Sequence, residues 1–216
     1  MSPPLNPQAT PFLPAITSLP TLADPALTST LDLLFEPSPD LHALALPTVR
    51  ALSFASYDDL VATLRAQLLD LASAVQGDDE EEKEGEGEGE GRRRLRAILG
   101  SHPRLGEKKQ KEVDAEGGAG LSQLSAAEQR HLSEEDEELA GLNWEYEERF
   151  PGLRYVVWVN GRGRGEVMAD MRRRIRRGDV AEEEREGIQA MCDIAADRAR
   201  KLLQKAAEEA AESSQG

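Results

Sequence analysis

The chain has 216 residues, of which 39% are hydrophobic, 31% charged and 4% aromatic, and its formal net charge is −15. This length and composition suit one domain with a modest core. The single cysteine, Cys192, excludes an internal disulfide and a zinc site built on several cysteines, and the three scattered histidines predict no metal centre. The apolar runs are far shorter than the roughly 18 residues of a membrane-spanning helix, so no membrane association is expected. No secretory signal opens the chain.

The negative charge is concentrated in one stretch. From Asp78 to Glu90, nine acidic residues and one lysine give a local charge of −8, which leaves −7 for the rest of the chain. Alternating Gly and Glu offer no apolar side chain to bury, so we expect a mobile acidic insertion at residues 77–91. The overall charge argues against general nucleic-acid binding.

The N-terminal half is expected to be helical after a Pro-rich tail. Asp24 and Pro25 suit a helix start, and Ser56 suits the start of a longer helix with a leucine stripe. A further helix has an apolar face that continues to His102. The helices predicted here cover residues 26–35, 40–46, 57–76 and 92–102.

The C-terminal half is expected to contain three more helices. They cover residues 126–148, the stretch from the turn at 160–165 to Arg177, and the stretch that follows Asp179 as its cap. Residues 154–159 have the β-branched and aromatic composition of a strand, but no partner strand is evident. We interpret the arginine-rich run at 172–177 as solvated surface near a helix C-terminus rather than as a nucleic-acid site.

Four polar side chains are placed where chemistry is possible, and each also has a structural interpretation. His102 lies at the end of a helix, where its ring can cap carbonyls or face a ligand. Ser125 and Glu128 fit a capping box, which would also hold the carboxylate in place. Arg198 lies within an apolar stripe and therefore needs an anionic partner, either a structural Glu or a bound carboxylate.

Five short motifs occur in a definite order along the chain. They are His-Pro-Arg-Leu-Gly at 102–106, Ser-x-x-Glu-Gln at 125–129, Leu-Asn-x-x-Tyr-x-x-Arg-Phe at 142–150, Val-Asn-Gly-Arg at 159–162 and Ile-Ala-x-x-Arg at 194–198. Together they resemble the OHCU decarboxylase family, the ureidoimidazoline decarboxylases of urate breakdown. The resemblance spans roughly residues 13–203.

The resemblance implies an all-α fold: a single compact multi-helix domain at 12–205 with one extended connecting segment, between tails at 1–11 and 206–216. It implies decarboxylation of 2-oxo-4-hydroxy-4-carboxy-5-ureidoimidazoline to (S)-allantoin without a cofactor, in a homodimer. It assigns acid–base chemistry to His102 and Glu128. It assigns substrate binding to Pro103, Ser125, Gln129, Val157 and Arg198.

The sequence departs from the family pattern in the acidic insertion and in a long connection between His102 and Glu128. Two other functions stay open: a non-catalytic helical interaction protein, and another cofactor-free lyase or hydrolase acting on a related ureide. The C-terminal Ser-Ser-Gln-Gly lacks a peroxisomal signal, so a cytoplasmic enzyme is expected rather than a peroxisomal one.

Overall fold

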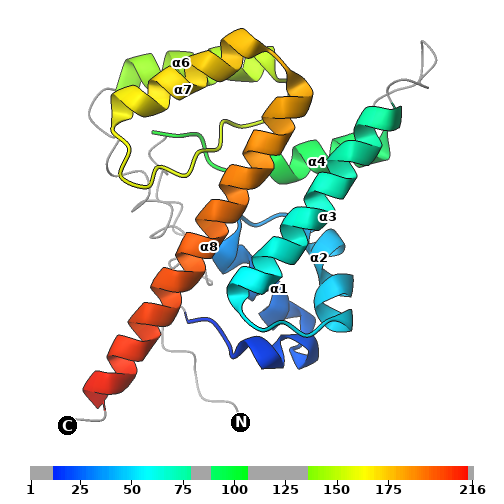
Figure 1. Ribbon diagram of the computed structural model, residues 1–216, viewed down its shortest axis with the longest axis vertical. Helices are drawn as coiled ribbons and strands as arrows, with labels where there is room; N and C mark the ends of the chain where they lie inside the picture. The colour runs from blue at the N-terminus through cyan, green and yellow to red at the C-terminus, as the bar shows by residue number, and fades with distance from the viewer. Residues whose placement is uncertain (1–11, 79–88, 107–135, 214–216) are drawn as a thin grey trace.

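The computed structural model describes residues 12–78, 89–106 and 136–213, and within these ranges it is helical without a strand (Figure 1). The prediction of an all-α fold is therefore confirmed. The elements are η1 (Ile16–Thr21), α1 (Asp24–Leu34), α2 (Pro39–Ala51), α3 (Tyr57–Asp78), α4 (Glu90–Leu99), α6 (Asp136–Arg149), α7 (Arg164–Arg177) and α8 (Val180–Ser213).

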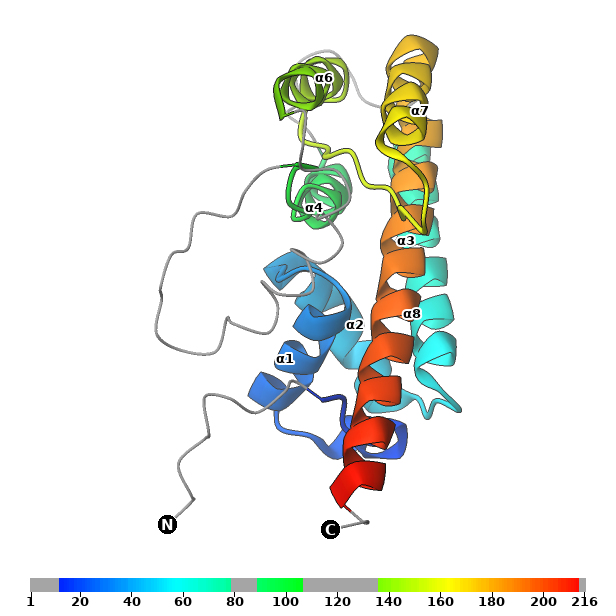
Figure 2. The same ribbon diagram turned by 90° about the vertical axis from the view of Figure 1, so that its left-hand side faces the viewer.

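Helix α8 runs through the whole molecule and packs most extensively against α3 (Figures 1 and 2). Helices α6 and α7 lie side by side at the end where α8 begins, while α1 and α2 lie towards its other end. Charged residues recur along α8, and none of the helices in the described part of the chain combines the length and hydropathy of a membrane span.

The apolar stripes predicted from the sequence form the core. Leu60, Leu64 and Leu68 of α3 are fully buried, as are Ile188 and Ala195 of α8. Burying side chains of this size removes apolar surface from water at about 25 cal/mol per Å², which is the main force that holds such helices together. Leu139, Leu142 and Tyr146 of α6 are buried as well.

Several helix ends differ from the prediction. Asp24 is the first residue of α1 and not its cap; its carboxylate instead accepts a hydrogen bond from Arg50 at 2.5 Å. Ser38 caps α2, accepting from the amide of Leu41 at 3.2 Å. Asp179 caps α8 as predicted, and Gly178 ends α7 in the left-handed conformation at φ 63°. An L side chain is disfavoured at that φ, which explains why α7 ends there.

The predicted acidic insertion at 77–91 is only partly covered by the described residues. Helix α3 continues to Asp78 and α4 begins at Glu90, and residues 79–88 between them lie outside the described residues, as does the tail at 1–11. At the other end of the chain, α8 continues past residue 205 to Ser213, with its last turns exposed.

The arginine run on α7 is not simply solvated surface, so that interpretation was wrong. Arg174 is 5% exposed and pairs with Glu183 of α8 at 3.1 Å and with Asp170 at 2.9 Å. Glu183 also accepts a hydrogen bond from Tyr146 of α6 at 2.6 Å and pairs with Arg177 at 3.0 Å. This buried network joins α6, α7 and α8, because a charge withdrawn from water needs charged and hydrogen-bonding partners.

Candidate active site

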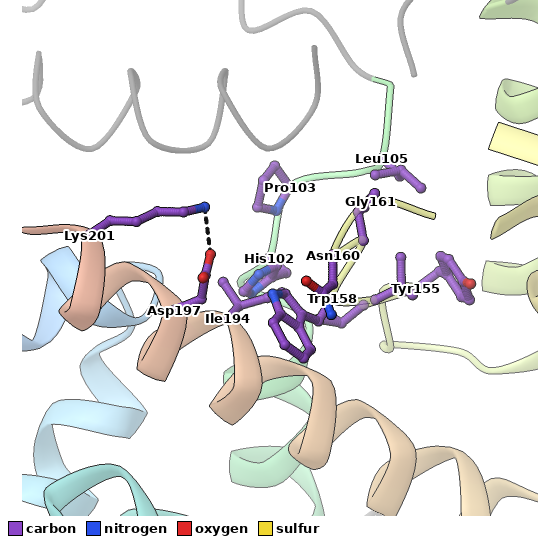
Figure 3. A pocket seen from close by; sticks show the side chains of 13 residues that line it. His102, Pro103, Leu105, Tyr155, Trp158, Asn160, Gly161, Ile194, Asp197 and Lys201 are labelled. Atoms are coloured by element: carbon purple, nitrogen blue, oxygen red, sulfur yellow. Dashed lines mark ion pairs between the residues drawn. The ribbon is translucent and has the colours of Figure 1, made fainter. Parts of the chain in front are cut away.

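A pocket of about 330 Å³ opens between α8, the loop after α4 and the segment that joins α6 to α7 (Figure 3). Its wall combines apolar side chains with a few polar groups. The lining residues are His102, Pro103 and Leu105 from the loop, residues 155–161 from the segment, and Ile194, Asp197 and Lys201 from α8.

His102 does not belong to the preceding helix. Helix α4 ends at Leu99, three residues earlier than predicted, and Gly100 lies so close to Gly152 that a Cβ on it would come within 2.7 Å of the Gly152 carbonyl oxygen. Because this close packing ends the helix, the chain turns at Gly100 and carries His102 into the pocket wall. The imidazole is 8% exposed, so it is held largely out of water there.

Helix α6 fixes the loop that carries His102. The side-chain amide of Asn143 donates to the carbonyl of Leu105 at 3.0 Å. Arg104 donates to both carboxylate oxygens of Glu147, at 2.6 and 2.7 Å. Such two-point guanidinium–carboxylate contacts fix geometry as well as distance. The two residues that follow Pro103 are therefore both anchored to α6.

The extended segment forms the opposite wall. Tyr155 is buried, and burial raises the pKa of its phenol, which stays protonated and donates to Asp170 at 2.8 Å. After the segment, Asn160 (φ 41°) and Gly161 (φ 77°) both adopt left-handed conformations, which Asn and Gly tolerate best. This turn lets the guanidinium of Arg162 return to the carbonyl of Trp158. The prediction of an extended segment here, in place of a strand, is confirmed.

Helix α8 contributes three side chains at successive turns. Ile194, Asp197 and Lys201 are spaced so that one face of the helix meets the pocket. Figure 3 shows the Lys201 side chain reaching across to Asp197, with its ammonium nitrogen 2.5 Å from a carboxylate oxygen. The pocket thus has a charged edge on α8 and an apolar interior.

Arg198 lies on the neighbouring face of α8, next to the end of α1. Its guanidinium is 2% exposed and donates to the carbonyls of Leu34 and Phe35 at 3.2 and 3.1 Å, and to the carboxylate of Glu36 at 2.8 Å. The anionic partner that its apolar surroundings demand is therefore a structural glutamate in this structure. Arg198 is not among the residues that line the pocket.

The predicted site residues have three different outcomes. The structure brings His102, Pro103 and Val157 together in one pocket, while Arg198 lies beside it. The residues of the second motif, Ser125, Glu128 and Gln129, lie outside the described residues. The roles assigned to all these residues stay predictions.

Sequence reasoning missed the contributions of Trp158, Asp197 and Lys201 to the pocket. The helical spacing of Asp197 and Lys201 from Ile194 is visible in the sequence, but an Asp and a Lys four residues apart usually form a solvated surface pair. Within the described ranges, no group of three histidine, cysteine or acidic side chains is arranged to hold a metal ion.

Comparison with protein families gives one match. Residues 20–200 match the family model described as OHCU decarboxylase, which covers most of the chain and every element from α1 to the middle of α8. Neither the curated proteins nor the solved structures contain a match.

Proposed function

Since the chain belongs to the OHCU decarboxylase family, and is therefore a carboxy-lyase that acts in urate degradation, we propose that it forms (S)-allantoin and CO2 without a metal or organic cofactor. Membership confirms the resemblance given by the five motifs. The observation that supports the proposal is the position of His102, a buried acid–base group in the wall of a pocket large enough for a small ureide.

The substrate contains its own electron sink. The ring carbon that loses CO2 bears a hydroxyl group and lies next to a C=N bond. When its bond to the carboxylate breaks, CO2 leaves and the electron pair forms a C=C bond to the carbon that carries the ureido group. The C=N bond becomes a single bond, its nitrogen takes up a proton, and an enol results. The hydroxyl proton then leaves as a carbonyl forms, and a proton is added to the carbon that carries the ureido group. The enzyme must therefore move protons and control the face of their delivery.

His102 is suited to that proton transfer. An imidazole can accept the hydroxyl proton and return one, and such acid–base catalysis typically contributes about 10²–10⁴-fold to a rate. Pro103 and the clamp between Arg104 and Glu147 fix the approach of the ring. Val157, in a segment that is neither helix nor strand, can offer backbone groups that are not used in a regular hydrogen-bonding ladder.

The remaining roles come from the family. Glu128 and Gln129 hold the ureido group, Ser125 supports them, and Glu128 shares the proton chemistry. Arg198 binds the anionic edge of the substrate, which requires its guanidinium to exchange a contact with Glu36 or a carbonyl for the ligand.

Circular dichroism during urate oxidation tests the proposal. Allantoin formed without the enzyme is racemic, so the protein should produce a dichroic signal of (S)-allantoin while CO2 is released. The same rate after exhaustive dialysis against a chelator is expected if no metal takes part. Racemic product at the uncatalysed rate would contradict the proposed reaction.

The family resemblance also supports a homodimer. Light scattering of the purified chain at micromolar concentration should then give twice the mass of 23.6 kDa that the sequence predicts. A monomer mass over the whole concentration range used for activity would contradict it.

A further inference from the structure

The edge of the pocket on α8 carries a charged pair, Asp197 and Lys201. Neither residue is one that the five motifs specify. The Lys201 ammonium lies 2.5 Å from a carboxylate oxygen of Asp197, and the two side chains are 61% and 20% exposed. The carboxylate is therefore the less exposed of the two, and the lysine side chain is largely exposed to solvent. Figure 3 shows the Lys201 side chain at one end of the group of lining residues.

Lys201 provides a permanent positive charge at this pocket. Among the described residues that line it, Lys201 is the one lysine or arginine. The nearest arginine along α8 that faces inward, Arg198, directs its guanidinium to Glu36 and to the end of α1. An anion that enters the pocket from solvent therefore meets the ammonium group of Lys201 first.

The pair of Asp197 and Lys201 contributes little to the stability of the fold. An Asp four residues before a Lys on a largely exposed helix face stabilises a helix only slightly. Replacement of either residue should therefore leave the protein folded, so its effect on ligands can be measured directly.

We propose that Lys201 binds the carboxylate of the substrate at the open edge of the pocket, and that Asp197 holds the ammonium group there when the pocket is empty. This inference rests on the proposed function. It adds a substrate-binding contact and names the charged group of the substrate that the contact recognises.

The contact with Lys201 can form with the substrate but not with the product. The carboxylate is the group that leaves as CO2, and the resulting allantoin is neutral, so the contact exists before the reaction and is lost after it. A carboxylate loses its charge as the C–C bond breaks, so the contact is weaker in the transition state than in the bound substrate. Removing it should therefore raise KM without lowering kcat.

Two stable ureides allow a direct binding test by titration calorimetry. Allantoate is a carboxylate with two ureido groups, and allantoin carries a ureido group without the carboxylate. Lys201→Met should weaken allantoate binding about 3- to 10-fold and change allantoin binding less than about 2-fold. Lys201→Arg should retain most of the allantoate affinity. Arg200→Met, which removes the same charge from an exposed site on α8, is the matched control and should have no effect.

A double variant tests the part played by Asp197. Without the lysine, the Asp197 carboxylate should repel an incoming anion. Allantoate should therefore bind more tightly to Asp197→Asn/Lys201→Met than to Lys201→Met. Equal affinities of these two variants would refute the role of Asp197.

The role of Lys201 would be refuted if allantoate bound equally well to wild type and Lys201→Met, if Arg200→Met caused the same loss, or if wild type bound no allantoate. These outcomes are separate from the proposed function. Wild-type enzyme that forms (S)-allantoin, together with unaltered KM in Lys201→Met, would overturn this inference and leave the decarboxylase intact. Wild-type enzyme without decarboxylase activity would overturn the function itself.

Discussion

Two regions along α8 use charged residues in opposite ways. Near its start, Arg174 and Glu183 are buried and satisfy each other within a network that joins three helices. Further along, Asp197 and Lys201 pair at the open edge of a cavity. The first arrangement is buried and fixed by neighbours on every side, whereas the second can exchange its partner for a ligand at little cost. Burial and access, rather than residue type, thus separate structural from functional charge.

Among replacements of residues that line the pocket, a replacement of His102 should have the largest effect on catalytic activity. We expect His102→Asn to lower kcat about 10²- to 10⁴-fold, because the proton transfer loses its acid–base group. The thermal midpoint should change little, since asparagine fills part of the same space. Steady-state kinetics with dichroic detection of the product gives both the rate and the stereochemistry.

His42→Asn is the matched control for that variant. His42 is hydrogen-bonded to Asp32 at 2.6 Å, on α2 and away from the pocket, so its replacement should leave kcat within about 2-fold. Full stereoselective turnover by His102→Asn would remove His102 from the chemistry.

Breaking the buried network should have the largest effect on stability. Arg174→Met removes the guanidinium that pairs with Glu183, Asp170 and Glu186. This should lower the free energy of unfolding by about 3–5 kcal/mol, even though Glu183 keeps its pair with Arg177. Arg172→Met is the control, because Arg172 forms an exposed pair with Glu138 and its loss should cost no more than about 1 kcal/mol. Urea denaturation measures both. Equal, small losses would show that the network is dispensable.

Arg198 is next to Asp197 in the chain but is buried like Arg174, and a double variant separates its possible roles. Arg198→Met alone should destabilise the fold strongly, since the buried Glu36 carboxylate would lose its ion pair with Arg198. Glu36→Met/Arg198→Met removes both charges and should recover most of that stability. If Arg198 also binds substrate, the refolded double variant should show KM raised about 10-fold, the expected loss of one charge-assisted contact. An unchanged KM would leave Arg198 a purely structural role.

The same contrast explains what the sequence could predict. The leucine stripe of α3, the end of α7 at Gly178 and the cap Asp179 follow from spacing within one element, and all three are found. The burial of Arg174 depends on partners from α6 and α8, which no local pattern reveals. Tertiary contacts likewise decide where α4 ends, because Gly152 is remote in sequence from Gly100.

The candidate site was predictable to the extent that motifs mark its residues. His102, Pro103 and Val157 were named from the family resemblance and meet in one pocket. Lys201 was not, because an Asp–Lys pair at helical spacing is typical of any solvated helix face. Its place at a cavity depends on the path of the extended segment, and that path is set by contacts such as the one between Tyr155 and Asp170.

The smallest effect is expected at Glu147, which links the loop of His102 to α6. The hydrogen bond from Arg104, together with Arg154, lowers the pKa of this carboxyl in the folded protein below its usual value. A lowered folded pKa means that the stabilisation is present above the unfolded pKa of about 4.5 and is lost as pH falls through the folded value. At pH 7, Glu147→Gln should therefore be less stable than wild type by about 0.5–1 kcal/mol, and the difference should shrink at acid pH. Denaturation midpoints at a series of pH values measure this, with Glu148→Gln as an exposed control on the same helix. A difference that stayed constant into acid would show that Glu147 contributes packing rather than charge, and that the His102 loop is held mainly by Asn143.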